Sequence, residues 1–187
     1  MTTLPRDETD RVAVEPATID DAALLARVAA TLFAQTFGDA NRPEDLTAYL
    51  AEAFSENRQR DELSGGPNRI WVARDAHDRV VGYAHVRLDS VPRTVPPGGE
   101  RPAELARLYA DRAWHGLDVG GALMRTCIAS ARAHGADWLW LGVWEQNPRA
   151  IAFYQKHGFR TIGEQTFVLG TDRQRDLVMA LDLTTNH

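Results

Sequence analysis

The feature that most constrains the fold is an alternation of strands and helices in the second half of the chain. The segment 138–144, WLWLGVW, is a nearly continuous apolar run of strand length, which is typical of a central strand buried on both faces. It lies between two segments with helical periodicity, 117–135 and 147–158, and the first of these follows a β-rich segment at 103–110. This order predicts a partly parallel sheet that helices cover on both faces.

The other segments extend this pattern to the order β-α-α-β-β-β-α-β-α-β-β without an internal repeat. Periodicity and helix-boundary residues predict strand 11–17, helices 18–37 and 43–61, strands 69–75, 79–88 and 103–110, helix 117–135, strand 138–144, helix 147–158, and strands 159–169 and 174–183. Residues 89–102 contain four prolines and predict a loop. Residues 1–10 predict a flexible arm in front of one domain, 11–187.

Composition excludes several classes of protein. A length of 187 residues suffices for one full hydrophobic core. The net charge of −5 argues against general binding to nucleic acids or anionic membranes, and no apolar run reaches the ~20 residues of a membrane span. Cys127 is the only cysteine, so no intramolecular disulfide forms. The six histidines lack the paired spacing of a metal site. We therefore expect a cytoplasmic protein without a metal.

The first segment that carries chemistry is LYADRAWHGLDVGGALM at 108–124. A strand enters a turn with glycines at 116, 120 and 121, and a helix follows. Glycines let a ligand approach the backbone, and the first helical turn offers unpaired N–H groups, so the segment predicts an anion site for a pyrophosphate. A strand-to-helix turn without a ligand is the alternative. The segment lacks a Walker lysine and a G-x-G-x-x-G motif.

The second segment is GVWEQNPRAIAFYQKHGF at 142–159. Asn147 is the expected N-cap of a helix that ends at Gly158. The spacing of Asn147, Ile151 and Tyr154 predicts that they share one helix face. Alternatively, Asn147 only caps the helix and Tyr154 only packs in the core.

Together, the two segments resemble the GNAT acetyltransferase superfamily. That family has a (Gln/Arg)-x-x-Gly-x-(Gly/Ala) motif after a strand and a later Asn-x-x-Ala-x-x-(Phe/Leu)-Tyr-x-x-x-Gly-Phe segment. The matching residues here are Leu108, Tyr109, Ala110, His115, Asp118 and Gly120, followed by Asn147, Ala150, Phe153, Tyr154, Gly158 and Phe159. The resemblance implies an α/β (α+β) GNAT fold, with a mixed, mostly antiparallel sheet of about seven strands. A V-shaped splay between strands 4 and 5 and about four flanking helices belong to that fold.

The resemblance also implies acetyl-CoA as co-substrate, no metal, and direct attack by a primary amine on the thioester. The backbone of Leu108 and Ala110 would pair with pantetheine, and an N–H near Tyr109 would hold the thioester carbonyl. Asn147 would orient pantetheine or the helix start. The full set of expected cofactor-binding residues is Leu108, Tyr109, Ala110, His115, Gly116, Leu117, Asp118, Val119, Gly120, Gly121, Asn147, Ile151 and Tyr154.

Two catalytic roles follow from this chemistry. Tyr154 is the candidate general acid for the departing thiolate. Glu104 is the candidate base, because strand alternation would put it on the face of Leu108 and Ala110. Glu145, beside the cofactor helix, is the competing base. The alternative for both carboxylates is an exposed position on the surface.

Two residues depart from the family motif. His115 stands at the Gln/Arg position, where backbone N–H groups make the main phosphate contact. Asp118 replaces the middle glycine, and a carboxylate there disfavours a pyrophosphate unless it points to solvent or caps the helix. We expect Asp118 to act as the cap.

A narrower resemblance concerns the acceptor. The segment 142–159 and the residues after it resemble bacterial spermine/spermidine N-acetyltransferases, which favours a polyamine or another small amine as acceptor. A protein or peptide N-terminal acetyltransferase and a non-catalytic CoA-binding regulatory module are the alternatives. The expected partner is a small-molecule amine, neither a nucleic acid nor a membrane, and a homodimer stays open.

Overall fold

The computed structural model describes residues 12–38, 41–94, 99–170 and 172–185, so the arm expected at 1–10 lies outside the described residues. A seven-stranded mixed sheet has the order β1-β2-β3-β4-β5-β7-β6. Its strands are β1 (Ala13–Pro16), β2 (Asn68–Arg74), β3 (Val80–Arg87), β4 (Pro102–Ala110), β5 (Trp138–Trp144), β6 (Arg160–Leu169) and β7 (Asp172–Asp182). Only β4 and β5 pair in parallel, and the other neighbouring strands are antiparallel. The predicted mixed, mostly antiparallel sheet is confirmed.

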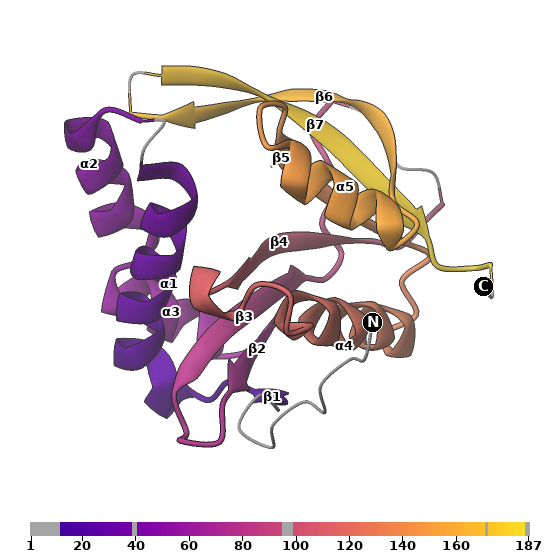
Figure 1. Cartoon of the computed structure of the whole chain (residues 1–187). Coiled ribbons are helices and arrows are strands. Elements are labelled where there is room, and N and C mark those ends of the chain that lie inside the picture. The colour runs from indigo at the N-terminus through magenta and orange to yellow at the C-terminus, as the bar shows by residue number, and fades with distance from the viewer. Residues whose placement is uncertain (1–11, 39–40, 95–98, 171, 186–187) are drawn as a thin grey trace, which may run out of the picture.

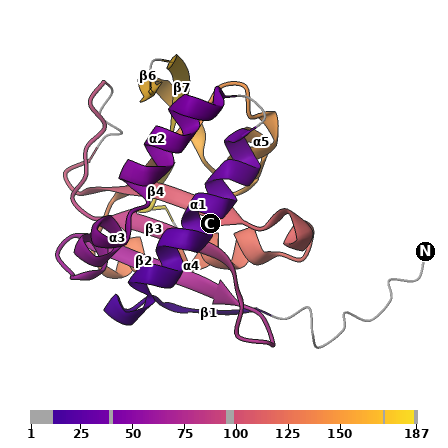
Figure 2. The ribbon, with the colours of Figure 1, turned by 90° about the vertical axis from the view of Figure 1, so that its left-hand side faces the viewer.

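Helices cover both faces of this sheet (Figure 1). They are α1 (Ala22–Phe37), α2 (Pro43–Ala53), α3 (Glu56–Leu63), α4 (Val119–Ala133) and α5 (Pro148–Lys156). Helices α1 to α3 lie on one face, and α1 and α2 are seen in front of the sheet in Figure 2. On the other face α4 and α5 pack against apolar residues of the central strands.

The helix predicted over 43–61 is two helices. Helix α2 ends at Ala53, and Phe54 has φ −123°, outside the helical region. The Ser55 side chain then caps α3 by accepting a hydrogen bond from the Arg58 N–H, 3.3 Å away. Because the chain turns here, the Phe54 ring is buried against Phe33, with ring centroids 5.5 Å apart. The break therefore adds one helix to the predicted number and brings an aromatic ring towards the sheet.

The sheet opens between β4 and β5, as the fold prediction expects. The two strands pair only from Pro102 to Glu104, opposite Trp138 to Trp140. Beyond this point β4 stays paired with β3 as far as Ala110, and β5 stays paired with β7 as far as Trp144. The facing edges of β4 and β5 therefore have no strand partner among the described residues.

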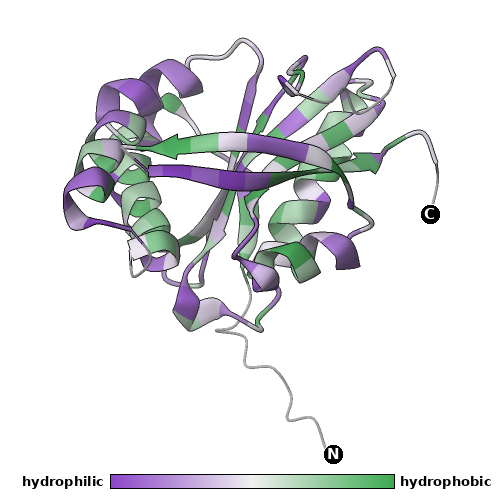
Figure 3. Cartoon of the chain, turned by 90° about the horizontal axis from the view of Figure 1, so that it is seen from above, coloured by the Kyte–Doolittle hydropathy of each residue, from purple (hydrophilic) through white to green (hydrophobic). Residues whose placement is uncertain are grey.

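The β6–β7 hairpin arches from the sheet towards α2 (Figure 1). The end of β6 that reaches the helices is hydrophobic (Figure 3). There Leu169 is buried, and the Phe167 and Tyr49 rings lie edge to face, with centroids 5.7 Å apart. The hairpin thus closes over the space between the opened sheet and helices α1 and α2.

The described parts of loop 89–102, which are 89–94 and 99–101, lie against the half of the sheet that contains β5, β6 and β7. The Trp140 indole N–H donates to the carbonyl of Ser90, and the Thr94 hydroxyl donates to the carbonyl of Glu164 on β6. Within the described residues, we find no helix whose length and hydrophobicity would let it cross a membrane.

Candidate active site

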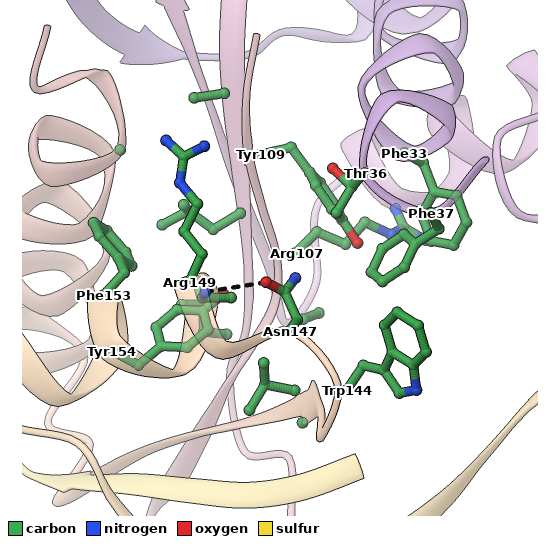
Figure 4. Close-up of a pocket in the computed structure, with 18 of the residues that line it drawn as sticks. Phe33, Thr36, Phe37, Arg107, Tyr109, Trp144, Asn147, Arg149, Phe153 and Tyr154 are labelled. Atoms are coloured by element: carbon green, nitrogen blue, oxygen red, sulfur yellow. Dashed lines mark hydrogen bonds between the residues drawn. The ribbon is translucent and has the colours of Figure 1, made fainter. Parts of the chain in front are cut away.

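A cavity of about 570 Å³ occupies the opening between β4 and β5. Figure 4 shows its two sides, with Arg149, Phe153 and Tyr154 on one and Phe33, Phe37 and Trp144 on the other. The predicted site residues in its lining are Glu104, Leu108, Tyr109, Ala110, His115, Gly116, Asp118, Val119, Gly120, Gly121, Asn147 and Tyr154. The two predicted segments therefore meet in one cavity, although they are separated in sequence.

The N-terminus of α4 lies at one end of this cavity. The first helical hydrogen bond runs from the Ala122 N–H to the Asp118 carbonyl. The N–H groups of Val119, Gly120 and Gly121 have no acceptor among the described residues. A side chain at Gly120 would place its Cβ 3.4 Å from the Phe153 ring. A glycine at this position therefore leaves the approach to these N–H groups open. Free N–H groups and a helix dipole fit a pyrophosphate.

Cationic side chains surround this end. Arg149 and Arg112 both line the cavity, and neither is in the predicted set. The Arg112 side chain donates to the carbonyl of Gln35 at the end of α1. Burial lowers the pKa of His115, and the positive charge of Arg149 lowers it further. His115 is therefore neutral near pH 7, and its Nε2 lies 3.2 Å from the carbonyl oxygen of Ala110. The sequence could have predicted Arg112 and Arg149, because arginines next to a helix N-terminus are typical of an anion site.

Asp118 does not cap α4 with its side chain, which corrects the prediction. It occupies the N-cap position with φ 63°, in the left-handed region, and makes no capping hydrogen bond. Its carboxylate accepts a hydrogen bond from Arg125, two turns along the helix, at 2.9 Å. The carboxylate still lies over the first turn of α4, because a Cβ on Gly121 would clash with Asp118 Oδ1. Arg125 partly neutralises the charge, and half of the Asp118 side chain is exposed.

Of the three residues predicted to share one face of α5, Asn147 and Tyr154 line the cavity and Ile151 does not. Asn147 is the N-cap, and its Oδ1 accepts a hydrogen bond from the Ala150 N–H at 3.1 Å (Figure 4). The helix itself begins at Pro148, and its residues in the cavity lining are Arg149 together with Ala150, Phe153 and Tyr154, the last three spaced i, i+3, i+4. Ile151 packs against the core under α4 and α5 instead. Leu117 also lies outside the cavity lining.

Tyr154 has the surroundings of a proton donor. Its ring packs against Phe153 and Phe159, with centroid distances of 5.5 and 5.9 Å. Burial raises the pKa of the Tyr154 phenol well above its usual value, so the phenol is protonated throughout the physiological range. No hydrogen bond joins its hydroxyl to any described residue, which leaves the hydroxyl available to a ligand in the cavity.

Glu104 does not share a face with Leu108 and Ala110, and this prediction was wrong. A β-bulge interrupts the pairing of β3 with β4, because His85 lies opposite Arg107 while the next residue, Val86, lies opposite Leu105. The extra residue is Ala106. It reverses the alternation, so Glu104 lies on the face of Arg107 and Tyr109.

Both predicted bases are already held by arginines. The Glu104 carboxylate accepts hydrogen bonds from Arg87 at 2.9 Å and from the Ser90 hydroxyl at 2.7 Å. Glu145 pairs with Arg175 at 2.7 Å and lies outside the cavity lining. Of the two, only Glu104 is placed where a substrate could contact it.

Aromatic side chains form the other end of the cavity, which the sequence analysis missed. Phe37 of α1 connects this group, with its ring centroid 6.4 Å from Tyr109 and 6.2 Å from Trp144. We call this end the aromatic compartment, and its rings are those of Phe33, Phe37, Tyr49, Phe54, Tyr109, Trp144 and Phe167. Arg107 also reaches it, but its guanidinium donates two hydrogen bonds to the Glu62 carboxylate, at 2.6 and 3.2 Å.

Comparison with known proteins identifies this combination of fold and site. The family model described as Acetyltransferase (GNAT) family matches residues 32–159, which include both predicted segments. The chain belongs to the GNAT acetyltransferase family. The predicted family, the GNAT fold and the acyltransferase class are therefore confirmed.

Relatives of this GNAT protein are found in bacteria. It is 37% identical over 164 residues to an uncharacterised N-acetyltransferase of Mycobacterium tuberculosis, covering 87% of this chain and 98% of that protein. It is 32% identical to an uncharacterised N-acetyltransferase of Lactobacillus delbrueckii, covering 79% and 83%. The narrower resemblance to spermine/spermidine N-acetyltransferases stays a prediction.

A solved structure shows the same GNAT fold. The PaiA N-acetyltransferase of Thermoplasma acidophilum, crystallised in complex with coenzyme A, superposes with a TM-score of 0.73 at 19% identity. The match covers 92% of this chain and 99% of that chain.

Proposed function

We propose that this GNAT protein transfers the acetyl group of acetyl-CoA to a primary amine of a small molecule, by direct attack of the amine on the thioester. One observation carries the proposal. A single cavity runs from the free N–H groups of α4, through the opening between β4 and β5, into the aromatic compartment. Such a cavity has room for a pyrophosphate at one end and an acceptor at the other, with the reacting atoms between them.

The residues present suit acetyl-CoA as co-substrate, which supplies an activated acetyl thioester. The α4 N-terminus, with Arg112 and Arg149 beside it, would hold the pyrophosphate. The unpaired edge of β4 at Leu108 and Ala110 would pair with the amide groups of pantetheine, as an added strand would. A backbone N–H near Tyr109 would donate to the thioester carbonyl.

Two further residues would act on the co-substrate. The Tyr154 phenol, protonated and without a partner among the described residues, would donate its proton to the departing thiolate. Asn147 uses Oδ1 for the helix cap, and its Nδ2 group remains to orient pantetheine.

The test is thiol release from acetyl-CoA by the purified protein across amines of several kinds: polyamines, arylalkylamines, amino acids, aminoglycosides and N-terminal peptides. Release with small amines and not with peptides supports the proposal. Release only with peptides would indicate the N-terminal acetyltransferase instead. Tight acetyl-CoA binding by calorimetry without release from any amine would indicate a CoA-binding regulatory module.

A further inference from the structure

The acceptor end of the cavity contains a carboxylate that neither the family motif nor the predicted chemistry uses. Asp176 lies on β7, opposite Trp144 of β5 and Gln165 of β6. The next residue, Leu177, packs against the core beneath α5. Strand alternation therefore points Asp176 to the opposite face, into the cavity that it lines.

A glycine makes room for this carboxylate. A Cβ on Gly142 of β5 would lie 3.2 Å from Asp176 Oδ2 and 2.5 Å from Gln165 Nε2. Any other residue at 142 would have to displace these two side chains. Gly142 interrupts an otherwise apolar strand, and its position explains why a glycine is suited to it.

Asp176 is buried without a partner. Only 8% of its surface is exposed, and no described residue donates a hydrogen bond to it or pairs with its charge. Burial raises its pKa to about 6, and no cation is close enough to oppose this shift. A largely buried carboxylate without a partner raises the free energy of the folded protein. A cationic ligand would remove that cost.

The other acidic side chains in the described lining are already paired. Glu104 is held by Arg87 and Ser90, and Asp118 by Arg125 at the pyrophosphate end. The acceptor end therefore offers one free negative charge. A polyamine would bring further ammonium groups among aromatic rings, where no second carboxylate is free to receive them.

The walls around Asp176 are apolar and aromatic. Trp144 lies opposite Asp176 on β5, Phe37 contacts both Trp144 and Tyr109, and Phe167 lies on the same face of the neighbouring strand. Aromatic faces bind both flat apolar groups and ammonium ions, the latter through cation–π attraction. The compartment thus combines one anchor for a cation with a wall for an aromatic body.

We propose that Asp176 binds the ammonium group of the acceptor, and that the acceptor is a primary monoamine with an aromatic body, of the arylalkylamine kind. This inference rests on the proposed function. In the reaction, the ammonium gives one proton to the Asp176 carboxylate, directly or through water, and becomes the neutral amine. The amine nitrogen then bonds to the thioester carbonyl carbon as the carbon–sulfur bond breaks, and the thiolate takes a proton from Tyr154. The second proton of the nitrogen leaves as the amide forms and returns, through water, to the Tyr154 phenolate, while Asp176 releases its proton to solvent.

The experiment compares the wild type with Asp176→Asn, using phenethylamine, tryptamine and spermidine as acceptors. Asp182→Asn is the matched control, because Asp182 lies on the same strand but outside the cavity, with its carboxylate bonded to Thr184. We expect the wild type to prefer phenethylamine or tryptamine to spermidine by at least about tenfold in kcat/KM. Asp176→Asn should lower kcat/KM for these amines by about 10²-fold, and Asp182→Asn should not.

A binding measurement separates this inference from the proposed function. Calorimetry in the presence of coenzyme A, where no transfer occurs, should show phenethylamine binding to the wild type at least about tenfold more tightly than 2-phenylethanol, which has no charge. Asp176→Asn should remove that difference while it keeps its affinity for acetyl-CoA. This comparison of amine with alcohol on the wild type stands even if the variant does not fold.

Two results would overturn the inference and leave the proposed transferase activity intact. One is a preference for spermidine, and the other is a kcat/KM of Asp176→Asn within about threefold of the wild-type value. Charge-dependent binding of phenethylamine without thiol release from any amine would support the ammonium site and contradict the proposed function.

Discussion

Asp118 stands where the family motif has a glycine, and it sets the charge beside the predicted pyrophosphate site. Its left-handed backbone and its pairing with Arg125 let the chain tolerate a carboxylate there. The half-exposed carboxylate still adds a negative charge next to the free N–H groups of α4.

Asp118→Asn should therefore bind acetyl-CoA several-fold more tightly than the wild type. Asparagine also adopts the left-handed conformation, so the turn is kept. Calorimetry at low salt and at 0.5 M salt checks this, and the gain should shrink at high salt because the charges are screened. Equal affinities at low salt would mean that Arg125 already cancels the charge.

Tyr154→Phe should lower kcat by about 10²-fold or more, the contribution of one general acid. The phenylalanine ring keeps the packing against Phe153 and Phe159, so acetyl-CoA affinity and thermal stability should change little. Steady-state kinetics beside calorimetry make the measurement. Near-normal turnover would remove Tyr154 from the chemistry and leave it a core residue.

Asp176 should make the stability of the protein depend on pH. Its pKa is about 6 in the folded protein and about 3.9 in the unfolded chain. The folded state thus holds the proton more tightly, and stability contributed by the protonated form is lost as pH rises from about 4 through 6. The free energy of unfolding of Asp176→Asn should exceed that of the wild type by on the order of 2 kcal/mol at pH 8 and by far less at pH 4. Urea unfolding at both values tests this, and a pH-independent difference would contradict the raised pKa.

At the scale of single elements, Asn147 both begins α5 and faces the cavity. Asn147→Ala should cost about 1 kcal/mol of stability through the lost cap, and should also weaken acetyl-CoA binding. Asn147→Asp is the comparison, because aspartate keeps the cap while it replaces the Nδ2 donor with a charged acceptor. Calorimetry and urea unfolding on both variants separate the roles. If neither variant changes acetyl-CoA affinity, Asn147 acts only as a cap.

How far the sequence predicts the elements depends on whether the deciding interaction is local. The break before α3 was readable, because Ser55 is a standard N-cap residue within the predicted helix. The bulge at Ala106 was not, because it arises from the register of β3 against β4, which no local pattern encodes. The prediction for Glu104 failed for this reason. Helix α5 was placed well, but Ile151 does not line the cavity, because Asn147 precedes the helix and does not share its periodicity.

For the whole molecule, the sequence predicted the cofactor side far better than the acceptor side. The pyrophosphate turn and α5 are continuous segments, so their residues could be found by spacing. The aromatic compartment draws Phe37, Tyr49, Trp144 and Phe167 from distant parts of the chain. In the sequence, each of these residues looks like an ordinary core residue. Only the fold brings them together around Asp176. Trp144, at the end of the apolar strand β5, faces the cavity.

The two halves of the sheet should be coupled by the co-substrate. They are paired across β4 and β5 over three residues, and acetyl-CoA would bridge the remaining edges. A ligand at a concentration of 100 times its Kd adds about 2.7 kcal/mol to the free energy of unfolding. This should raise Tm by roughly 5–10 °C for a chain of this size. Amide hydrogen exchange should slow both in 105–110 and in the first turn of α4. Protection confined to α4 would show that pantetheine does not pair with β4.

The short pairing of β4 with β5 has a consequence beyond ligand binding. An open strand edge is the place where a foreign strand can add, and proteins usually shield such edges against aggregation. On the proposed function this edge stays open because pantetheine pairs with it. We therefore expect the ligand-free protein to self-associate more readily than the complex, with the co-substrate as the shield that other proteins build from their own chain.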